Sequence, residues 1–400
     1  MAWKEGDRVS ERAEFLKLAQ VEGCVFSTLC RRFGISRKTG YKWRERGQES
    51  GDLRDRSRRP KCSPRKTADA VEQSVLSLRT EHPTWGGRKL RKRLLDLGLE
   101  SVPSASTITA ILHRHELISP TESQKRGAYT RFERSVPNEL WQMDFKGEFA
   151  ISSRKKCYPL TILDDHSRYS LGIRACNNQR RETVERQLRR VFDRYGIPHT
   201  MYVDNGPPWG NSCRTSRHTR FSVWLMRNDI EVIHGRPYHP QGRGKLERFH
   251  RTLKQEVIQE RQFGSMSRAQ SCFDDWRPVY NHERPHEGLN DETPGSLYRV
   301  SDRSFRKHAK PYSYSSRFQT RKANRGGEIK FNGKSYRLSE VFIDEQVGLC
   351  PTPADGVWDI YYCRFVVGQL DERTGRIRRT SRLAEFRYAP SSQAAGKGNS

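Results

Sequence analysis

Three acidic residues, Asp144, Asp204 and Glu247, occupy positions from which carboxylates could bind metal ions. Asp144 lies in the alternating apolar run WQMDF, and Asp204 ends the short apolar run MYVD, which the turn residues Asn205 and Gly206 stop. Both patterns place an aspartate where a strand ends. Carboxylates are the hard oxygen ligands that Mg²⁺ or Mn²⁺ prefers, so such a site requires no histidine or cysteine.

Glu247 lies on an expected amphipathic helix. Apolar residues recur at intervals of three and four along one side of it, namely Leu246, Phe249, Leu253 and Val257. Glu247 borders this stripe and shares a face with Arg251 and Lys254. A ladder of surface salt bridges is the alternative interpretation, and the helix considered alone favours it.

The region around the three acids alternates between strands and helices. Strands are expected at 140–151, 157–163, 169–175, 200–203 and 231–233, and helices at 182–195, 221–228 and from 246 onward. Such alternation predicts an α/β core, a mixed sheet with helices packed on it.

Four motifs in this region, in order, carry a family resemblance: WQMDF, LDDHSRY, VDNGPPWGN and HPQGRGKLERFHRTLK. With them the chain resembles the DDE transposases of bacterial insertion sequences, relatives of retroviral integrases. The resemblance covers about 136–298. It implies a ribonuclease-H-like integrase catalytic core that begins with three antiparallel strands and brings strand one, strand four and the last helix together.

The resemblance also implies a site. Asp144, Asp204 and Glu247 would be the catalytic residues and metal ligands, with Asp144 bridging two Mg²⁺ or Mn²⁺ ions. Two such ions about 4 Å apart can generate an oxygen nucleophile and stabilise a leaving oxygen in phosphodiester chemistry. Lys254 would face phosphate, and Arg251 and His250 would help to place the DNA strand. Water would free a 3′-OH at an element end, and that hydroxyl would attack target DNA without a covalent enzyme intermediate.

Two points qualify this site. Asp164 and Asp165 are competing carboxylates, but an Asp pair that ends a strand in a turn is expected to bond local backbone and Arg168. The interval between the second and third acids is longer than in retroviral integrases because of the segment 209–219, which leaves the conformation of that loop open.

The composition points to a polyanionic partner. The 400 residues carry a net charge of +28, and the pI is near 10.0. Nucleic acid is the first candidate, because so strong a positive field attracts polyanions, although a ribosome-like or polybasic membrane-surface protein could carry similar charge. With the transposase resemblance, double-stranded DNA is the expected partner. No apolar run reaches the roughly 18 residues of a membrane span, and the N-terminus lacks a signal peptide. A cytoplasmic, nucleoid-associated protein without a membrane partner is expected. The nine cysteines are scattered and contain no C-x-x-C pair, so reduced thiols are expected.

Residues 1–50 are expected to form a helix-turn-helix DNA-binding domain. Apolar periodicity at 15–19 and 26–33 is followed by Gly34 and a new helix capped by Ser36. Its first turns hold Arg37, Lys38 and Lys42, where a recognition helix meets bases and phosphates. Solvated surface charge is the alternative. Gly40 inside this helix costs about 1 kcal/mol relative to alanine.

A basic linker is expected at 51–67 and a second helical or helix-turn-helix module at 68–130. In the latter, five of the seven residues in RKLRKRL, from Arg88 to Leu94, are basic, and Arg88 and Lys89 are candidate DNA contacts. A bundle that contributes only stability is the alternative.

Alternating runs around Asn332-Gly333 predict a β-hairpin in a small β-barrel-like domain at 324–388, for DNA contact, subunit assembly or support. A disordered tail is expected at 389–400.

Together these features predict a transposase that binds the terminal inverted repeats of an insertion sequence and cuts and joins DNA as a homo-oligomer. One alternative is a catalytically inactive DNA-binding repressor or relic, and another is a hydrolytic nuclease. Intact acids at all three positions argue against the relic, and two helix-turn-helix candidates argue against an unspecific nuclease.

Overall fold

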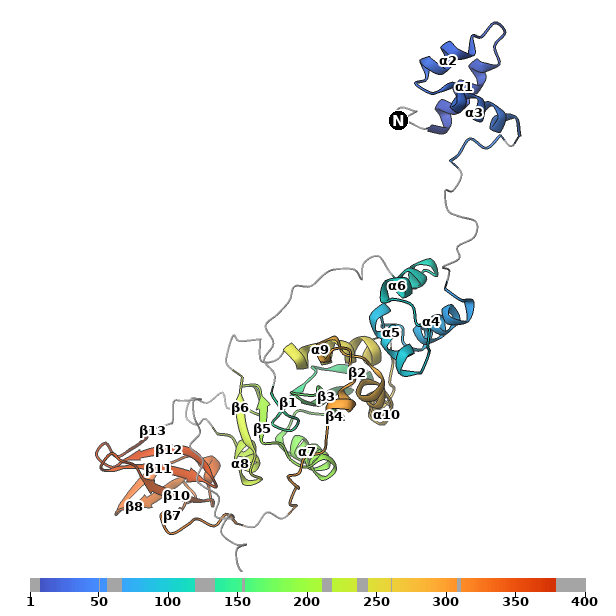
Figure 1. Cartoon of the computed structure of the whole chain (residues 1–400). Coiled ribbons are helices and arrows are strands. Elements are labelled where there is room, and N and C mark those ends of the chain that lie inside the picture. Colours follow the sequence, from blue (N-terminus) through green and yellow to red (C-terminus); the bar gives the residue numbers. More distant parts are fainter. Residues whose placement is uncertain are drawn as a thin grey trace, which may run out of the picture. The chain divides into compact units, whose positions relative to one another are not determined.

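The computed structural model describes residues 8–49, 51–55, 67–118, 134–152, 155–210, 218–235, 244–259, 261–307 and 311–378. The chain divides into two compact units, Met1–Thr67 and Ala68–Ser400 (Figure 1). Most of the predicted linker and all of the predicted tail lie outside the described residues. Among the described residues, no helix has the length and apolar character needed to cross a bilayer.

The first unit contains three helices, α1 (Arg8–Ala19), α2 (Phe26–Arg32) and α3 (Arg37–Glu49). Their buried core includes Phe15, Leu29, Cys30 and Ile35. The Ser36 hydroxyl accepts a hydrogen bond from the Thr39 amide at 3.1 Å, as expected of an N-cap. The predicted helix-turn-helix order and its cap are therefore confirmed.

Gly40 of α3 lies at a close contact between the helices of this unit. A Cβ atom there would lie 2.6 Å from Cys30 Sγ and 3.1 Å from the Phe15 ring. The glycine that weakens the sequence pattern of α3 is thus a packing requirement, because only a hydrogen atom fits between these side chains.

We therefore expect Gly40→Val to lower the free energy of local unfolding of α1–α3 by about 2–3 kcal/mol through overpacking. Hydrogen exchange of the backbone amides of 8–49 in the full chain measures it. Gln48→Val, at an exposed position of the same helix, is the control for β-branching. Equal effects of the two substitutions would contradict the packing argument.

The second unit begins with helices α4 (Asp69–Glu81), α5 (Gly87–Asp96) and α6 (Ala105–Arg114). Helices α5 and α6 were expected, whereas α4 was not. Their shared core contains Val75, Trp85, Leu90, Ile108 and Leu112. Ser104 caps α6 through the Thr107 amide.

A six-stranded mixed sheet follows. Its strands are β1 (Leu140–Phe145), β2 (Phe149–Ser152), β3 (Lys155–Asp164), β4 (Ser170–Cys176), β5 (Thr200–Val203) and β6 (Glu231–His234). Strands β1, β3 and β4 pair antiparallel, whereas β5 is parallel to both β1 and β6. This arrangement confirms the mixed sheet with three antiparallel strands at its start.

The single strand predicted at 140–151 is two separate strands in the structure. The run 140–151 breaks between β1 and β2, where Gly147 adopts a φ of +90°. Only glycine enters this region of backbone conformation readily, so the chain turns there. Strand β2 then pairs with the first residues of β3, and β1 pairs with its last residues.

Helices cover both faces of the sheet (Figure 1). One core cluster joins the strands to α7 (Arg181–Tyr195) and α8 (Arg220–Arg227). The other joins them to α9 (Gly244–Leu253), the π-helix η3 (Lys254–Ile258) and α10 (Met266–Pro278). The chain continues through η4 (Val279–Glu283), η5 (Glu287–Leu289) and α11 (Pro294–Leu297).

The last part is antiparallel and all-β. Five strands pair in the order β13-β12-β11-β10-β7, and β8 and β9 form a separate hairpin. Their bounds are β7 (Gln319–Lys322), β8 (Glu328–Phe331), β9 (Lys334–Arg337), β10 (Gln346–Pro351), β11 (Val357–Tyr362), β12 (Phe365–Asp371) and β13 (Arg376–Arg378), with η6 (Glu340–Phe342) between β9 and β10. The hairpin turns at Asn332-Gly333, both at positive φ, as predicted. Because β8 contacts β7 and β9 contacts β13, the hairpin lies between the two edges of the sheet.

Candidate functional site

Asp144 and Asp204 occupy matching places on adjacent parallel strands. Gln142 of β1 is in register with Tyr202 of β5, and each aspartate comes two residues later. Met143, Phe145, Met201 and Val203 belong to the core on the α7 and α8 side of the sheet. Since side chains alternate along a strand, Asp144 and Asp204 are at positions of the opposite face, which α9 covers.

Both aspartates are half-buried and bonded to nearby backbone. Asp144 Oδ1 accepts from the Phe145 amide at 2.8 Å, and Asp204 Oδ1 accepts from the Gly206 amide at 3.0 Å. These bonds orient the carboxylates at the carboxyl ends of the two strands. A carboxylate has about four acceptor sites on its two oxygens, so a backbone bond of this kind is compatible with metal binding.

Helix α9 buries its apolar side against the core and exposes its acid, Glu247. The predicted apolar stripe is buried, with Leu246 3%, Phe249 1%, and Leu253 and Val257 0% exposed. Glu247, Arg251 and Lys254 are all exposed, on α9 and the start of η3. Their exposure is as predicted, and the single face that they share stays a prediction from their spacing of four and three residues.

His250 holds this helix to the sheet. Its Nε2 lies 2.7 Å from Thr161 Oγ1, and that hydroxyl donates to the backbone carbonyl of Asp144 at 2.9 Å. Burial, reinforced by the nearby charge of Lys146, lowers the pKa of His250 to about 3. The imidazole is therefore neutral near pH 7 and bonded inward, which corrects the expectation that it helps to place the DNA strand.

The structure brings the three acids into one region but not into one set of ligands. Asp144 lies in β1 and Asp204 directly follows the neighbouring strand β5, and α9, which bears Glu247, contacts β1. Among the described residues, no group of three or more Asp, Glu, His or Cys side chains is placed to hold a metal ion. Residues 236–243 lie outside the described residues, and they include the first five residues of the motif HPQGRGKLERFHRTLK. So do 211–217 of the loop at 209–219.

The competing carboxylates have other partners. Asp164 accepts from the Asn138 amide at 2.7 Å and from the Ser167 amide and hydroxyl at 2.8 and 2.6 Å. It is fully buried, and burial raises its pKa. Asp165 accepts from the Arg134 amide at 2.9 Å and forms an ion pair with Lys245 at 2.8 Å. Local backbone bonding is confirmed for Asp164 through Ser167, whereas the backbone partner of Asp165 is the distant Arg134. The ion pair with Lys245 was not predicted.

Glu256, another acid near α9, is engaged by three side chains. It accepts from Thr84 at 2.7 Å and from the Trp276 indole at 2.9 Å, and it pairs with Arg284 at 3.2 Å. These contacts link η3 to the α4–α5 connection and to α10. Glu256 therefore has a structural role, which leaves Glu247 as the exposed acid of this helix.

The predicted DNA contacts of α3 are exposed. Arg37, Lys38 and Lys42 face solvent, while Gly40 and Trp43 between and beside them are buried. Tyr41, also exposed on α3, stacks on Phe26 with ring centroids 4.4 Å apart. Exposed basic side chains in the first turns of the third helix are what a recognition helix requires.

The predicted DNA contacts of α5 lie beside acids that follow α10 in the chain. Arg88 pairs with Glu287 at 3.2 Å, and in the same run Arg93 pairs with Glu283 at 2.7 Å. Burial, followed by the nearby Arg284 charge, lowers the pKa of Lys89 to about 8. The lysine is thus still mainly protonated at neutral pH.

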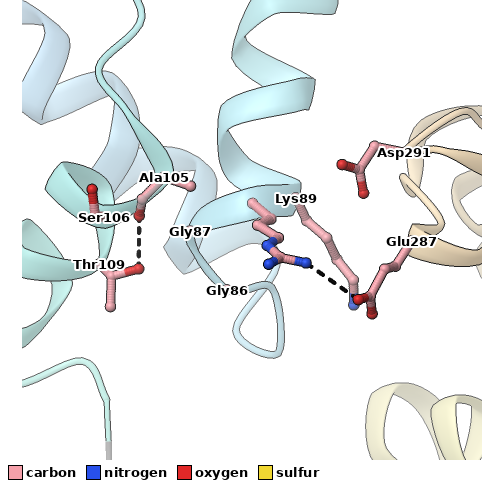
Figure 2. Close-up of a pocket in the computed structure, with 9 residues that line it drawn as sticks. Gly86, Gly87, Lys89, Ala105, Ser106, Thr109, Glu287 and Asp291 are labelled. Atoms are coloured by element: carbon pink, nitrogen blue, oxygen red, sulfur yellow. Dashed lines mark hydrogen bonds and ion pairs between the residues drawn. The ribbon is translucent and has the colours of Figure 1, made fainter. Parts of the chain in front are cut away.

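A hollow of about 400 Å³ opens here between the N-terminal ends of α5 and α6 and the 287–291 segment. Figure 2 shows Lys89 extending across it toward Glu287, with Ser106 and Thr109 on the α6 wall. Gly87 lets the start of α5 approach α6 closely, because a Cβ atom at this position would lie 2.4 Å from the Ala105 carbonyl oxygen.

Comparisons with known proteins agree with this layout. Models of an integrase core domain match residues 134–240 and 228–294, a homeodomain-like domain matches 39–112, and an IS481 family transposase C-terminal domain matches 318–378. An insertion element IS476 protein of Xanthomonas euvesicatoria is 29% identical over 241 residues, which cover 58% of this chain and 66% of the relative. An insertion element IS407 protein of Burkholderia multivorans is 28% identical over 162 residues, which cover 40% of this chain and 56% of the relative.

The matched regions thus span between about half and two thirds of these relatives. Among solved structures, the HTLV-2 integrase catalytic core domain in complex with magnesium is 15% identical, with a TM-score of 0.32, and covers 41% of this chain and 99% of that chain.

Proposed function

We propose that this chain, which belongs to the insertion-sequence transposases with an integrase-like core, binds the terminal inverted repeats of its element and catalyses DNA strand cleavage and strand transfer. The substrates are the element ends and a target duplex, both double-stranded DNA. Water attacks a phosphodiester at an element end and breaks its bond to the 3′ oxygen, which takes up a proton and leaves as a free 3′-OH beside a 5′-phosphate. That 3′-OH then loses its proton and attacks a target phosphodiester, where it displaces the 3′ oxygen of the target strand, so that one P–O bond forms and one breaks in each step.

The observation that carries the proposal is the matched placement of Asp144 and Asp204 at the ends of adjacent parallel strands. They are at positions of the sheet face covered by α9, the helix that presents Glu247. Three carboxylates from three elements are a donor set suited to Mg²⁺ or Mn²⁺, since hard cations take oxygen ligands.

In this proposal Asp144, Asp204 and Glu247 would hold two divalent ions. When bound, such ions supply a metal-activated oxygen nucleophile and charge stabilisation at the leaving oxygen. The backbone amides of Phe145 and Gly206 orient the two aspartates for that role.

The protein's own side chains position the DNA. Lys254 and Arg251 project from the same exposed face as Glu247, so they bind phosphates next to the cleaved bond. His250 and Thr161 keep α9 attached to the carbonyl of Asp144 and contact no DNA. Because an element has two ends, we propose that a homo-oligomer assembles on DNA, with each copy holding one end.

The test is strand cleavage and joining by the full chain on a duplex that carries the element end. We expect products only with Mg²⁺ or Mn²⁺, and we expect chelation to abolish them. Binding to the same duplex is measured on the same preparation. A protein that binds the ends but never cuts with either metal would be the repressor or relic, and one that cuts without joining would be the hydrolytic nuclease.

A further inference from the structure

The turn that ends β3 connects the strand of one catalytic acid with the helix of another. Asp165 follows β3 directly, and its amide donates to the carbonyl of Leu140 in β1 at 2.9 Å. Its side chain is only 6% exposed. A buried carboxylate is stable only if its oxygens are bonded or paired.

Both oxygens of Asp165 are engaged, by different elements. Oδ1 accepts from Gln142 Nε2 at 2.7 Å, and Oδ2 accepts from Lys245 Nζ at 2.8 Å and from the Arg134 amide at 2.9 Å. Lys245 also donates to the Asp165 carbonyl at 2.9 Å. The Lys245 side chain is 12% exposed, so this ion pair is well shielded from water.

The two side-chain partners stand next to proposed metal ligands. Gln142 comes two residues before Asp144 on the same face of β1, and Lys245 comes two residues before Glu247 in the first turn of α9. One carboxylate thus joins the strand of Asp144 to the start of the helix of Glu247.

A second polar link lies one turn further along. His250 bonds Thr161, which bonds the carbonyl of Asp144. The buried apolar stripe of α9 resists separation of the helix from the sheet, but apolar contacts are non-directional. The rotation and the axial position of the first turn therefore depend on directional bonds.

We propose that Asp165 is a positioning residue, which fixes the first turn of α9 on β1 through Lys245 and Gln142 and thereby sets the place of Glu247 relative to Asp144. The functional half of this inference rests on the proposed function. Asp165 itself would touch neither metal nor DNA.

The test uses Asp165→Asn, Lys245→Gln and the double variant in the full chain. The first substitution keeps an oxygen that can accept from Gln142 but removes the ion pair, and the second removes the same pair from the other side. We expect each single variant to raise hydrogen exchange of the backbone amides of 245–253. We also expect each to weaken Mn²⁺ binding, measured by calorimetry, by about 10-fold, a usual effect of a supporting residue behind metal ligands. The double variant should be no worse than either single variant, because all three lack one and the same link.

The control is Arg303→Gln, which removes the ion pair of Arg303 with Asp229 and the Arg303 hydrogen bonds to the backbone carbonyls of Pro198 and Asp229. None of these residues belongs to β1 or α9. Its thermal stability should fall while its Mn²⁺ affinity and the exchange of 245–253 stay parental. If Asp165→Asn does not fold, Lys245→Gln decides alone, because it leaves the Asp165 carboxylate with the Gln142 and Arg134 donors.

Parental exchange and parental Mn²⁺ affinity in both single variants of an active protein would overturn the positioning role alone. A parent that neither binds Mn²⁺ nor cleaves DNA would overturn the proposed function and, with it, the catalytic part of this inference. Additive losses in the double variant would show two separate roles and would also overturn it.

Discussion

Glu247→Gln is expected to abolish metal-dependent cleavage and joining, with a fall of at least about 10³-fold in rate, while the protein stays folded and bound to DNA. Glutamine keeps the size and helix propensity of glutamate but lacks the anionic charge that holds a divalent ion. Glu247 is exposed and makes no contribution to the apolar stripe, so folding should not depend on it. Binding to the element end should stay parental or tighten slightly, since a negative charge near phosphates is gone.

Asp144→Asn and Asp204→Asn should behave in the same way. The three effects should be non-additive, since each carboxylate serves one assembly and losing any one of them disables it. Strand cleavage with Mg²⁺, beside a binding measurement on the same preparation, checks both expectations.

Glu148→Gln is the matched control, because Glu148 is an exposed acid in the turn after β1 that pairs with Lys156. It removes the same charge a few residues from Asp144 and should cut at the parental rate. Parental cutting by Glu247→Gln would instead rule Glu247 out as the third ligand. Glu256 would be a poor replacement, since Thr84, Trp276 and Arg284 already engage it.

The sequence predicted what short-range patterns determine. The stripe of α9 has a period that only a helix satisfies, and all four of its members are buried. Ser36 caps α3, and Asn332-Gly333 forms the expected turn, because capping and turn formation depend on a few neighbouring residues. The strand patterns predicted that Asp144 and Asp204 come near the ends of strands, whereas their placement on adjacent strands was implied only by the family resemblance.

Contacts between distant segments were not predictable in this way. The sequence showed an Asp pair in a turn, but not that Lys245, eighty positions later, would pair with Asp165. The basic run of α5 was predicted to meet DNA, but its ion pairs were not predicted: Arg88 pairs with Glu287 and Arg93 with Glu283, two acids that follow α10 in the chain. Such pairings depend on which elements the fold brings together, and a charge pattern along one element does not encode its partner.

Two glycines, Gly147 and Gly40, have structural roles that the prediction from local sequence did not include. Gly147 lies inside an alternating apolar run, and the run was extended through it, although a glycine within a strand pattern often marks a turn or a bulge. Gly40 lowers the helix propensity of its segment, but the predicted helix forms, and the space around Gly40 requires glycine. At Gly40 tertiary packing overrides an intrinsic preference that holds for isolated helices.

The second large effect is expected at the element end, where Arg37→Ala, Lys38→Ala and Lys42→Ala together should weaken binding. All three side chains are exposed on α3, whose position is fixed by the close contact at Gly40. Each true base contact removed should cost about 1–3 kcal/mol, or about 5- to 150-fold in affinity. A phosphate contact removed should weaken binding to every sequence alike and should flatten the dependence of log K on log salt by about 0.9.

Titrations of an element-end duplex and of a scrambled duplex at several salt concentrations separate the two kinds of contact. The control replaces three exposed basic residues of the C-terminal domain, Arg325, Lys330 and Lys334, with alanine, so the loss of net charge is identical. If α3 is the recognition helix, the first variant loses preference for the element end and the control keeps it. Equal affinity of the α3 variant and the parent for the element end at every salt concentration would assign end recognition to another part of the chain. Because Asp144, Asp204 and Glu247 are intact in both variants, cleavage of saturating DNA should continue in each, and this separates recognition from catalysis.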